Sequence, residues 1–582
     1  MEKCAACHSR RTEICNGQVA KGLSGDNAGT RFDDFHALQL LSKQIYHDDG
    51  QIRDEDYVYG SFIQSKMFHK GIRCTDCHDP HSTKLKYDDN QLCTSCHQHP
   101  AGKYDSPNHH HHEPGTPGAS CVACHMPETT YMELDARRDH SFRVPRPDLS
   151  VKFGTPNACT GCHLDAKAVP ATKPSELTQY LDWINFRDAG NKAIDEELKR
   201  VDQQMLDAVK KWYPEGSSDT PKSEYYALLA DGKSGSANAV PTLREQALDR
   251  KSPGIFRASA MAELIDDPEV ESFEVAKKAL GDPDPKVVAV ALGRIESEIL
   301  RLLGMAQYGA PRAETISPVE DLTEMVAELC SHPSRRVRVE VARVLTTVPT
   351  EIRSGRLGPE RRSAYDRCLA EFKYSLQVEN DRASSHLQLS WIHEMGNNPQ
   401  EAMRAMRTAI RVEPQLAGTR SNLAVLMENE AQFISRNLQQ SSGQVGDVQK
   451  EMKRFQSLID EAKKLRSDDH ELLGEDIKRA EGIEGTHALE YRYGMSCYLQ
   501  DDLENAEKFL LRAYSDQQST PTYVLALATF YQQQEKFDLA AKYVQQLREI
   551  EPDNPGYKRL AEEILNALKQ QKKKETKPEE KK

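Results

Sequence analysis

The stretch CTDCHDPHSTKLKYDDNQLCTSCH, residues 74–97, contains the pattern Cys-x-x-Cys-His at each end. This pattern occurs five times, always before residue 164, and uses ten of the fourteen cysteines. Histidine makes up only 20 of 582 residues, so chance does not explain a histidine after each of five cysteine pairs. The pattern is typical of covalent attachment of c-type haem. The copies are CAACH (4–8), CTDCH (74–78), CTSCH (93–97), CVACH (121–125) and CTGCH (159–163).

Zinc is the alternative ligand for Cys-x-x-Cys pairs, as in zinc ribbons and fingers. Neither a zinc site nor a disulfide scaffold requires a histidine after each second cysteine, so we favour haem. In a helical turn, positions i, i+3 and i+4 share one face, which brings two thioether cysteines and the iron-binding histidine together. We therefore expect haem c at five covalent sites. The thioether residues are Cys4, Cys7, Cys74, Cys77, Cys93, Cys96, Cys121, Cys124, Cys159 and Cys162, and the motif ligands are His8, His78, His97, His125 and His163.

Histidine is concentrated in the same part of the chain, with fifteen of the twenty residues before residue 164. Ten remain after the motif histidines, which is enough for a second histidine ligand on every iron. Met67, Met126 and Met132 are alternative axial ligands. We expect some arginines of the basic cluster 137–147 to bind haem propionates, because a guanidinium donates two parallel hydrogen bonds to a carboxylate; the alternative is a basic surface loop. The ten histidines are His36, His47, His69, His81, His99, His109, His110, His111, His112 and His140.

Long stretches around the motifs resemble the multihaem c-type cytochromes of the cytochrome c554, hydroxylamine oxidoreductase and nitrite reductase superfamily. More closely, the chain resembles a bacterial group in which such a head is fused to HEAT and tetratricopeptide (TPR) repeats. The chain lacks the Cys-x-x-Cys-Lys motif of the nitrite reductases, which argues against nitrite reduction at its own haems. The resemblance lies in YHDDGQIRDEDYVYGSF (46–62), CHDPHS (77–82), HHHHEPGTPGASCVACHMP (109–127), YMELDARRDHSFRVPRPDLS (131–150) and GTPNACTGCH (154–163).

The resemblance implies which histidines are the distal iron ligands. It favours His47, His81, His140 and one or two of the run 109–112. We add His69, and from the run we select His110 and His112. Relatives of this kind usually carry a signal segment and further motifs upstream. Because this chain starts at its first motif, we expect a truncated or wrongly assigned N-terminus. Because c-type haem is attached outside the cytoplasm, we expect a periplasmic or otherwise exported protein.

Helical patterning follows the last motif. Proline-containing turns precede the Val- and Ala-rich stretches at 282–292 and 333–342, which is typical of HEAT-like pairs. Ala506 and Ala540 occupy equivalent positions 34 residues apart, the TPR period. The fold class expected is mainly α, with a loop-rich multihaem cytochrome c head followed by an α-solenoid that is HEAT-like and then TPR. The expected domains are the haem head (1–167), a helical connector (168–223), HEAT-like repeats (224–355), TPR-like repeats (365–568) and a disordered charged tail (569–582).

Composition limits the possible partners. The net charge of −13 argues against a nucleic acid partner, and no apolar run is long enough to span a membrane. We expect a multihaem cytochrome that carries electrons along closely packed haems and docks redox partner proteins through its repeats. The alternative is a multihaem oxidoreductase that acts on a small nitrogen or sulfur compound at a haem with an open coordination position.

Overall fold

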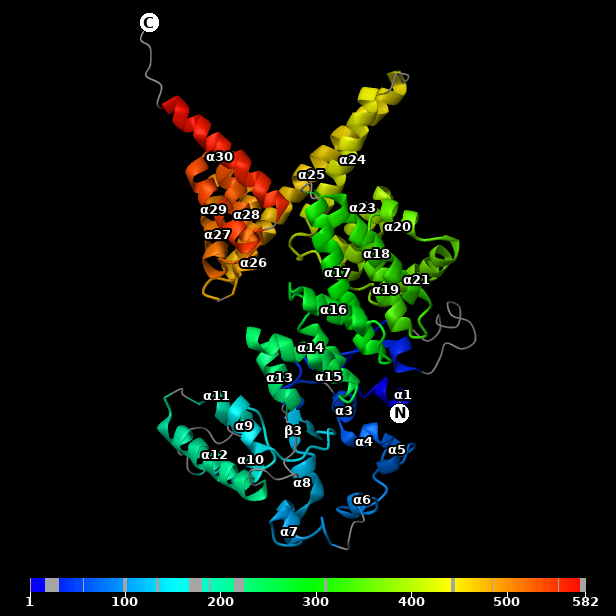
Figure 1. The fold of residues 1–582 in the computed structure, drawn as a ribbon, viewed down its shortest axis with the longest axis vertical. Helices are drawn as coiled ribbons and strands as arrows, with labels where there is room; N and C mark the ends of the chain where they lie inside the picture. Colours follow the sequence, from blue (N-terminus) through cyan, green and yellow to red (C-terminus); the bar gives the residue numbers. More distant parts are fainter. Residues whose placement is uncertain are drawn as a thin grey trace. The chain divides into compact units, whose positions relative to one another are not determined.

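The computed structural model places most of the chain in two compact units (Figure 1). Unit 1 comprises Met1–Ser297 and Ser331–Val341, and unit 2 comprises Glu298–Cys330 and Ala342–Lys582. The structure confirms the expected fold class, because a loop-rich N-terminal part is followed by stacked helices. It describes residues 2–15, 31–55, 57–97, 102–131, 135–165, 167, 180–187, 190–213, 224–307, 311–440, 445–483, 485–552 and 554–575.

Unit 1 begins with short elements, most of them helices of a single turn. Two antiparallel ribbons interrupt them, β1 with β2 and β3 with β4, and Glu13 lies opposite His36 in the first. Between residues 64 and 163, Ala119 and Pro147 are the only buried apolar side chains in the described part of the chain. The elements are α1 (Glu2–Ala5), β1 (Arg11–Glu13), η2 (Phe32–Asp34), β2 (His36–Leu38), α3 (Tyr57–Phe62), α4 (Lys66–His69), α5 (Cys74–Cys77), α6 (Gln91–Thr94), α7 (Pro107–His110), η3 (Pro117–Ala119), α8 (Cys121–His125), β3 (Glu128–Tyr131), β4 (Asp135–Arg138), α9 (Pro147–Phe153) and α10 (Thr160–His163).

Two helices follow the last motif, α11 (Tyr180–Asn185) and α12 (Lys192–Trp212). Trp183 of α11 packs in a small core with Ile194 and Leu198 of α12, and Leu164, directly after the last motif, lies against this core. The connector predicted for residues 168–223 therefore contains helices that pack on the haem-motif region, although residues 168–179 and 214–223 lie outside the described residues.

The remaining helices of unit 1 pack against the N-terminal segment. Leu41 donates its backbone N–H to Ser259 Oγ on α15 at 3.1 Å. Asp34 accepts from the backbone N–H and from the guanidinium of Arg335, both at 2.9 Å. A buried ion pair at 2.7 Å joins Arg257 to Asp282. These helices are α13 (Glu224–Lys233), η6 (Ala237–Ala239), α14 (Val240–Leu248), α15 (Gly254–Ala262), α16 (Val270–Ala279) and α17 (Pro285–Gln307), whose end belongs to unit 2.

Unit 2 is built from antiparallel helix pairs. Ala402, Ala506 and Ala540 stand at the small-residue positions of three of these pairs and are fully buried, which lets the paired helices approach closely. The elements are η7 (Arg312–Glu314), α18 (Ile316–Glu328), η8 (Leu329–Ser331), α19 (Arg335–Thr347), α20 (Thr350–Arg356), α21 (Pro359–Val378), α22 (Ala383–Met395), α23 (Pro399–Val412), α24 (Thr419–Gln440), α25 (Val445–Arg479), α26 (His487–Leu499), α27 (Leu503–Asp516), α28 (Pro521–Gln533), α29 (Phe537–Ile550) and α30 (Pro555–Glu575). Ser331 of η8 and residues 335–341 of α19 belong to unit 1.

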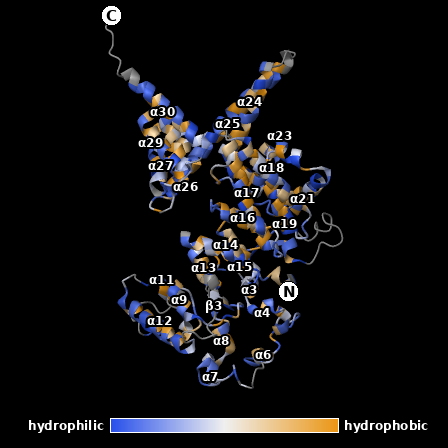
Figure 2. Cartoon of the chain, viewed as in Figure 1, coloured by the Kyte–Doolittle hydropathy of each residue, from blue (hydrophilic) through white to orange (hydrophobic). Residues whose placement is uncertain are grey.

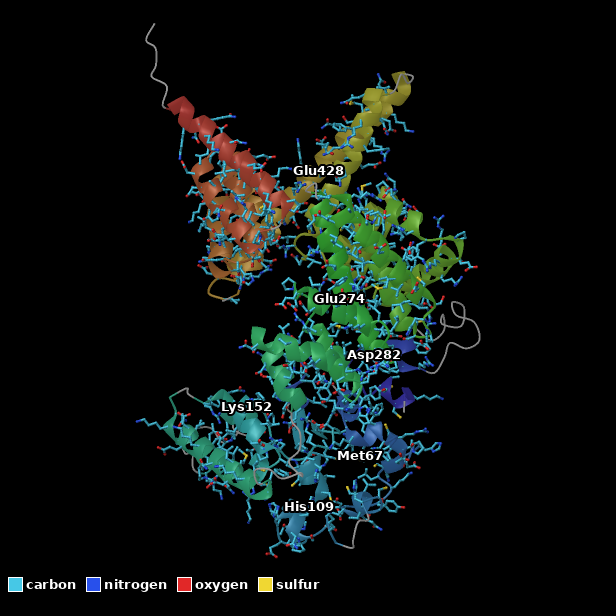
Figure 3. All side chains as sticks on the ribbon, viewed as in Figure 1. Met67, His109, Lys152, Glu274, Asp282 and Glu428 are labelled. Atoms are coloured by element: carbon cyan, nitrogen blue, oxygen red, sulfur yellow. The ribbon has the colours of Figure 1, made fainter. Side chains whose placement is uncertain are left out.

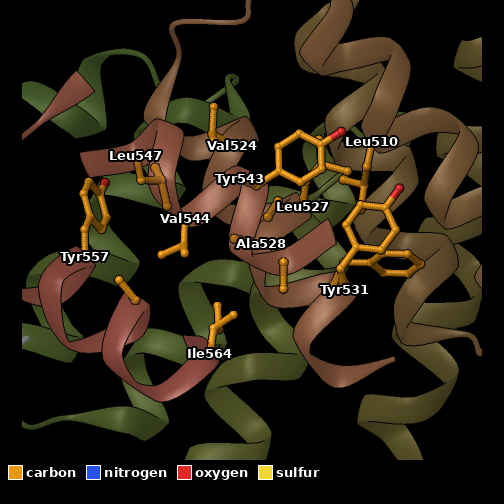
Figure 4. Packing of buried hydrophobic residues seen from close by; sticks show 14 of the residues in the cluster. Leu510, Val524, Leu527, Ala528, Tyr531, Tyr543, Val544, Leu547, Tyr557 and Ile564 are labelled. Carbon is orange, nitrogen blue, oxygen red and sulfur yellow. The ribbon is translucent and has the colours of Figure 1, made fainter. Parts of the chain in front are cut away.

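The last helices of unit 2 share one continuous apolar core (Figure 4). Leu527 on α28 is fully buried in it, and Tyr531 stacks on Tyr543 of α29. Hydrophobic and hydrophilic segments alternate along these helices, as expected for faces that pack on neighbouring repeats (Figure 2). No described helix is long and apolar enough to cross a membrane.

The structure of the C-terminus differs from the one expected from the sequence. The charged stretch from residue 569 was expected to be disordered, whereas α30 continues through it to Glu575. Lysine, glutamine and glutamate favour helix, and no glycine or proline interrupts this part of the tail. Residues 576–582 lie outside the described residues.

Candidate haem-binding sites

Each Cys-x-x-Cys-His motif forms one turn of helix, as its spacing predicts. The backbone N–H of His8, His78 and His97 donates to the carbonyl of the first cysteine of its motif at 2.9 Å. His163 does the same at 3.0 Å, and His125 lies within helix α8. The turn places both thiols and the imidazole on one face, because residues three and four apart are neighbours in a helix.

The cysteines divide into two groups by exposure. All ten motif cysteines are exposed or half-buried, whereas Cys15, Cys330, Cys368 and Cys497 are buried. A thiol that forms a thioether must reach the porphyrin, so accessibility of the motif cysteines fits covalent attachment. The four buried thiols fit the ordinary structural role of cysteine.

Consecutive motifs lie beside one another, as the interactions between their thiols show. A hydrogen bond with Cys121 raises the pKa of Cys93 and lowers that of Cys121, which joins the third motif to the fourth. Burial raises the pKa of Cys74, and both the charge of Cys4 and a hydrogen bond with it contribute, which joins the first motif to the second.

The other two neighbouring pairs of motifs interact through charge. Burial raises the pKa of Cys77, with contributions from Asp76 and then Cys96 of the third motif. Burial also raises the pKa of Cys159 to about 11, with a contribution from Cys124 of the fourth motif. Motifs that are consecutive in the sequence are therefore close enough in space for their thiols to interact.

Three motif histidines each face a histidine from another segment. The ring centroids are 6.5 Å apart for His78 and His140, and the planes differ by 22°. They are 6.0 Å apart and nearly parallel, at 9°, for His125 and His109. Two imidazoles bound on opposite sides of one metal ion, with metal–nitrogen bonds of about 2 Å, would place their centroids about 6 Å apart.

The third pair joins His163 and His112, with centroids 6.2 Å apart and planes at 47°. All three separations thus fit two histidines that share one iron. In each pair one histidine comes from a motif and the other from elsewhere in the chain.

Hydrogen bonds fix which ring nitrogen is available to a metal. His78 Nδ1 lies 2.9 Å from the carbonyl of Thr83, and His125 Nδ1 lies 2.6 Å from the carbonyl of Arg143. His140 Nδ1 lies 2.9 Å from the carbonyl of Arg138. Because a carbonyl only accepts, each Nδ1 carries the hydrogen and the lone pair remains on Nε2. The residues therefore fit an axially ligated haem.

The side chains of the four consecutive histidines, residues 109–112, contact different parts of the chain. His109 lies on α7 (Figure 3), and its ring faces that of His125, whereas the ring of His111 stacks on Trp212 at 5.0 Å. His111 has a left-handed backbone, with φ of 59°, which turns the chain after α7. His112, one residue later, faces His163.

His110 has a local role instead. Its Nδ1 accepts from the backbone N–H of His112 at 3.2 Å, and its carbonyl accepts from Nδ1 of His112 at 2.5 Å. A neutral ring that accepts at Nδ1 carries its hydrogen on Nε2, which removes the lone pair that iron would use. The structure thus places His109, and not the selected His110, opposite a motif histidine.

Gly118 makes room for the ring of His112. A Cβ at residue 118 would lie 2.4 Å from Cδ2 of that ring, well inside van der Waals contact. Gly118 in the sequence GTPGAS (115–120) indicates that another group approaches the backbone closely at this position. Which side chain does so could not be predicted from the sequence.

The remaining distal candidates have no motif histidine opposite them among the described residues. His47 is buried, its Nε2 has no hydrogen-bond partner there, and burial lowers its pKa to about 4. His36, which was not selected, is similar, with an unbonded buried Nδ1 and a pKa lowered to about 4 by burial and Arg11. His69 and His81 are exposed, and the alternatives His99 and Met132 lie outside the described residues.

The expected propionate partners interact with protein groups. Arg146 makes a two-pronged bond to Asp148, at 2.8 and 2.5 Å. Arg143 lies 4.0 Å from Asp49 and 3.8 Å from Asp139, in a half-buried network. These contacts hold the loop after the fourth motif in place, and the propionate role of the arginines stays a prediction.

Comparison with known proteins supports the paired motifs. The family model of the doubled CXXCH motif matches residues 66–102, which include the second and third motifs. This region therefore binds haem c through paired motifs. No curated protein matches the chain.

Solved structures with similar chains are helical repeat proteins. Yeast Tom70 is 13% identical, with a TM-score of 0.31, and the match covers 67% of this chain and 78% of that one. A monomeric mutant of IFIT1 is 10% identical, with a TM-score of 0.25, and the match covers 65% and 90%. Cut9 with Hcn1 is 13% identical, with a TM-score of 0.17, and the match covers 64% and 94%.

Proposed function

We propose that the N-terminal region carries five c-type haems and conducts single electrons along them. The observation that supports this most directly is that three motif histidines each face a second histidine at a ring separation that fits one shared iron. A bound haem supplies an iron that changes charge by one electron without forming or breaking bonds. The chain's own residues hold the haems, orient the axial imidazoles and keep neighbouring haems close.

The axial ligands proposed for three haems follow from the histidine pairs. His140 is the distal ligand opposite His78, His109 is opposite His125, and His112 takes this role opposite His163. The buried, unbonded Nε2 of His47 supports it as a distal ligand for one of the other two haems. Irons with two axial histidines have no open position, which favours electron transfer over chemistry on a substrate.

The repeat region, residues 383–575, supplies a surface for partner proteins in this proposal. Helical repeats present extended surfaces for protein binding. Several large apolar side chains are exposed there, among them Phe433 at 59% and Met452 at 53%. We propose a redox partner protein as the occupant and an exported location for the whole protein, because c-type haem is attached outside the cytoplasm.

The test is to produce the chain in a bacterium with a haem attachment system and to measure its intact mass and redox spectrum. A mass increase of five haems, with a low-spin spectrum that does not change under carbon monoxide, is expected. A stoichiometric carbon monoxide complex in the ferrous protein would contradict electron transfer as the main function. It would favour catalysis at a haem whose iron has an open coordination position. A protein without covalent haem would refute the proposal.

A further inference from the structure

Two cysteines of unit 2 lie together where the short helix η8 packs on α21. Cys330 belongs to η8, which directly follows α18, and Cys368 lies in the middle of α21. Both residues are buried, with 4% and 1% of their surface exposed. The Sγ atom of Cys368 donates to the backbone carbonyl of Cys330 at 3.1 Å. The two residues are therefore in direct contact, although 38 positions separate them in the sequence.

The two thiols also interact with each other. A hydrogen bond with the Cys368 thiol lowers the pKa of Cys330. Tyr365 lies one helical turn before Cys368, and burial raises the pKa of its hydroxyl to about 12, with contributions from both cysteines. Side chains from α21 therefore surround the Cys330 thiol. Two thiols in mutual hydrogen-bond contact are close to the arrangement from which a disulfide forms.

The helix before η8 also contacts α21. Arg361 of α21 pairs with Glu328 of α18 at 3.2 Å and with Glu324 of the same helix at 4.0 Å. Such exposed pairs contribute little stability, but they show that α18 and α21 lie side by side. A bond between the two cysteines would thus join elements that already pack together, so it requires no large movement of the backbone.

The proposed export of the chain bears on the chemical state of this pair. Disulfides form and persist in exported proteins, whereas the cytoplasm keeps thiols reduced. Cys497 is a useful comparison, because it is also buried in unit 2 but hydrogen-bonds Tyr493 of its own helix. The pair at residues 330 and 368 instead brings two sulfur atoms together in an oxidising compartment.

We infer that Cys330 and Cys368 form a disulfide that fixes η8 to α21 in the exported protein. This inference rests on the proposed function for the exported location. A bond across 38 positions also restricts the unfolded chain, so it should stabilise this part of unit 2.

The oxidant in this proposal is the disulfide of a thiol oxidoreductase in the same compartment. One cysteine thiolate attacks that disulfide, which forms a mixed disulfide and releases one thiol of the oxidant. The second cysteine then attacks the mixed disulfide and releases the other thiol. The chain thus gains one S–S bond, and the oxidant takes up two electrons and two protons. Because both cysteines are buried in the folded chain, the exchange takes place during folding.

The test counts free thiols in the full haem-loaded chain. The cells are lysed directly into denaturant with N-ethylmaleimide, which labels each free thiol before it can oxidise. Five haems use ten of the fourteen cysteines, so four thiols remain without a disulfide and two remain with it. We expect an intact mass with two maleimides, and four after chemical reduction. Peptide mapping without reduction should show the peptides of Cys330 and Cys368 linked.

Two variants sharpen the count, Cys330→Ala and the matched control Cys497→Ala. Cys330→Ala should carry three maleimides, because the loss of Cys330 frees the Cys368 thiol. Cys497→Ala should carry only one, because it removes a free thiol and leaves the disulfide intact. In denaturation followed by circular dichroism, a reductant should lower the midpoint of the parent chain more than that of Cys330→Ala, in which only the haems respond to it.

Two results would overturn the inference. Four maleimides on the parent chain would show that no disulfide forms, and an equal response of parent and Cys330→Ala to the reductant would show that the bond does not stabilise the fold. The peptide map of the parent needs no variant, so it decides even if Cys330→Ala does not fold. The haem mass of the same sample tests the proposed function separately, so five haems with four free thiols refute only the disulfide.

Discussion

The stretch with the last four haem motifs and the last repeats differ in what fills their interior. Between residues 64 and 163, the described chain buries only Ala119 and Pro147 among its apolar side chains. The helices from α26 to α30 instead share a continuous core of aliphatic and tyrosine side chains. The first stretch has too little apolar surface of its own to offset the entropy of folding, whereas the second has enough. In the proposed function, the haems supply the core that this stretch lacks.

The largest effect is expected from removing the haems. In the full chain made without haem attachment, residues 64–163 should be cleaved rapidly by a protease, because no apolar core protects them. Residues 487–575 should resist cleavage with or without haem. Limited proteolysis followed by mass spectrometry measures both regions in one sample. Equal protection of residues 64–163 in the two preparations would show that this part folds without its cofactors.

Removing a core side chain should test the other half of the comparison. Leu527 is fully buried in the core of the last repeats, so Leu527→Ala should lower the free energy of unfolding by about 2–5 kcal/mol. Chemical denaturation followed by circular dichroism measures the loss. The haem spectrum should stay unchanged, since this core lies in unit 2 and the motifs lie in unit 1. The exposed Leu539→Ala is the matched control, and an equal loss there would contradict the assignment of the core.

A smaller and local effect is expected at Gly118. In Gly118→Ala the new methyl group would meet the ring of His112 at 2.4 Å and displace it. One of the five haems should then lose its second histidine and become high-spin, which electron paramagnetic resonance detects. Gly161→Ala is the control, because a Cβ at residue 161, inside the fifth motif itself, meets nothing within 4 Å. A low-spin spectrum for all haems in Gly118→Ala would exclude His112 as a distal ligand.

The same contrast explains what could be predicted from the sequence. The motif turns are local, since a hydrogen bond from His78 to Cys74 is contained in the spacing of the motif itself. The 34-residue spacing of Ala506 and Ala540 likewise reports repeats that pack on their neighbours. The ring that faces His78 is that of His140, which no local pattern indicates, because the two residues lie far apart in the sequence and meet only in the folded chain.

The run of four histidines shows the same limit at closer range. Composition identified it as a source of distal ligands, and the resemblance to multihaem cytochromes implied one or two of its members. The choice between His109 and His110 depends on the left-handed backbone at His111 and on the hydrogen bonds of His112. Neither feature is visible in a row of identical residues.

The smallest effect is expected where the repeat region ends in the charged helix α30. Lys572 and Asp538 form an ion pair at 3.0 Å, but the two side chains are 59% and 74% exposed. Exposed pairs of this kind are screened by water and salt, so Lys572→Ala should change the free energy of unfolding by no more than about 0.5 kcal/mol. Chemical denaturation at low and high salt measures this change in the free energy of unfolding, and the loss in Leu527→Ala serves as the reference. A loss comparable to that of Leu527→Ala would mean that charge pairing, and not the apolar core, stabilises the last repeats.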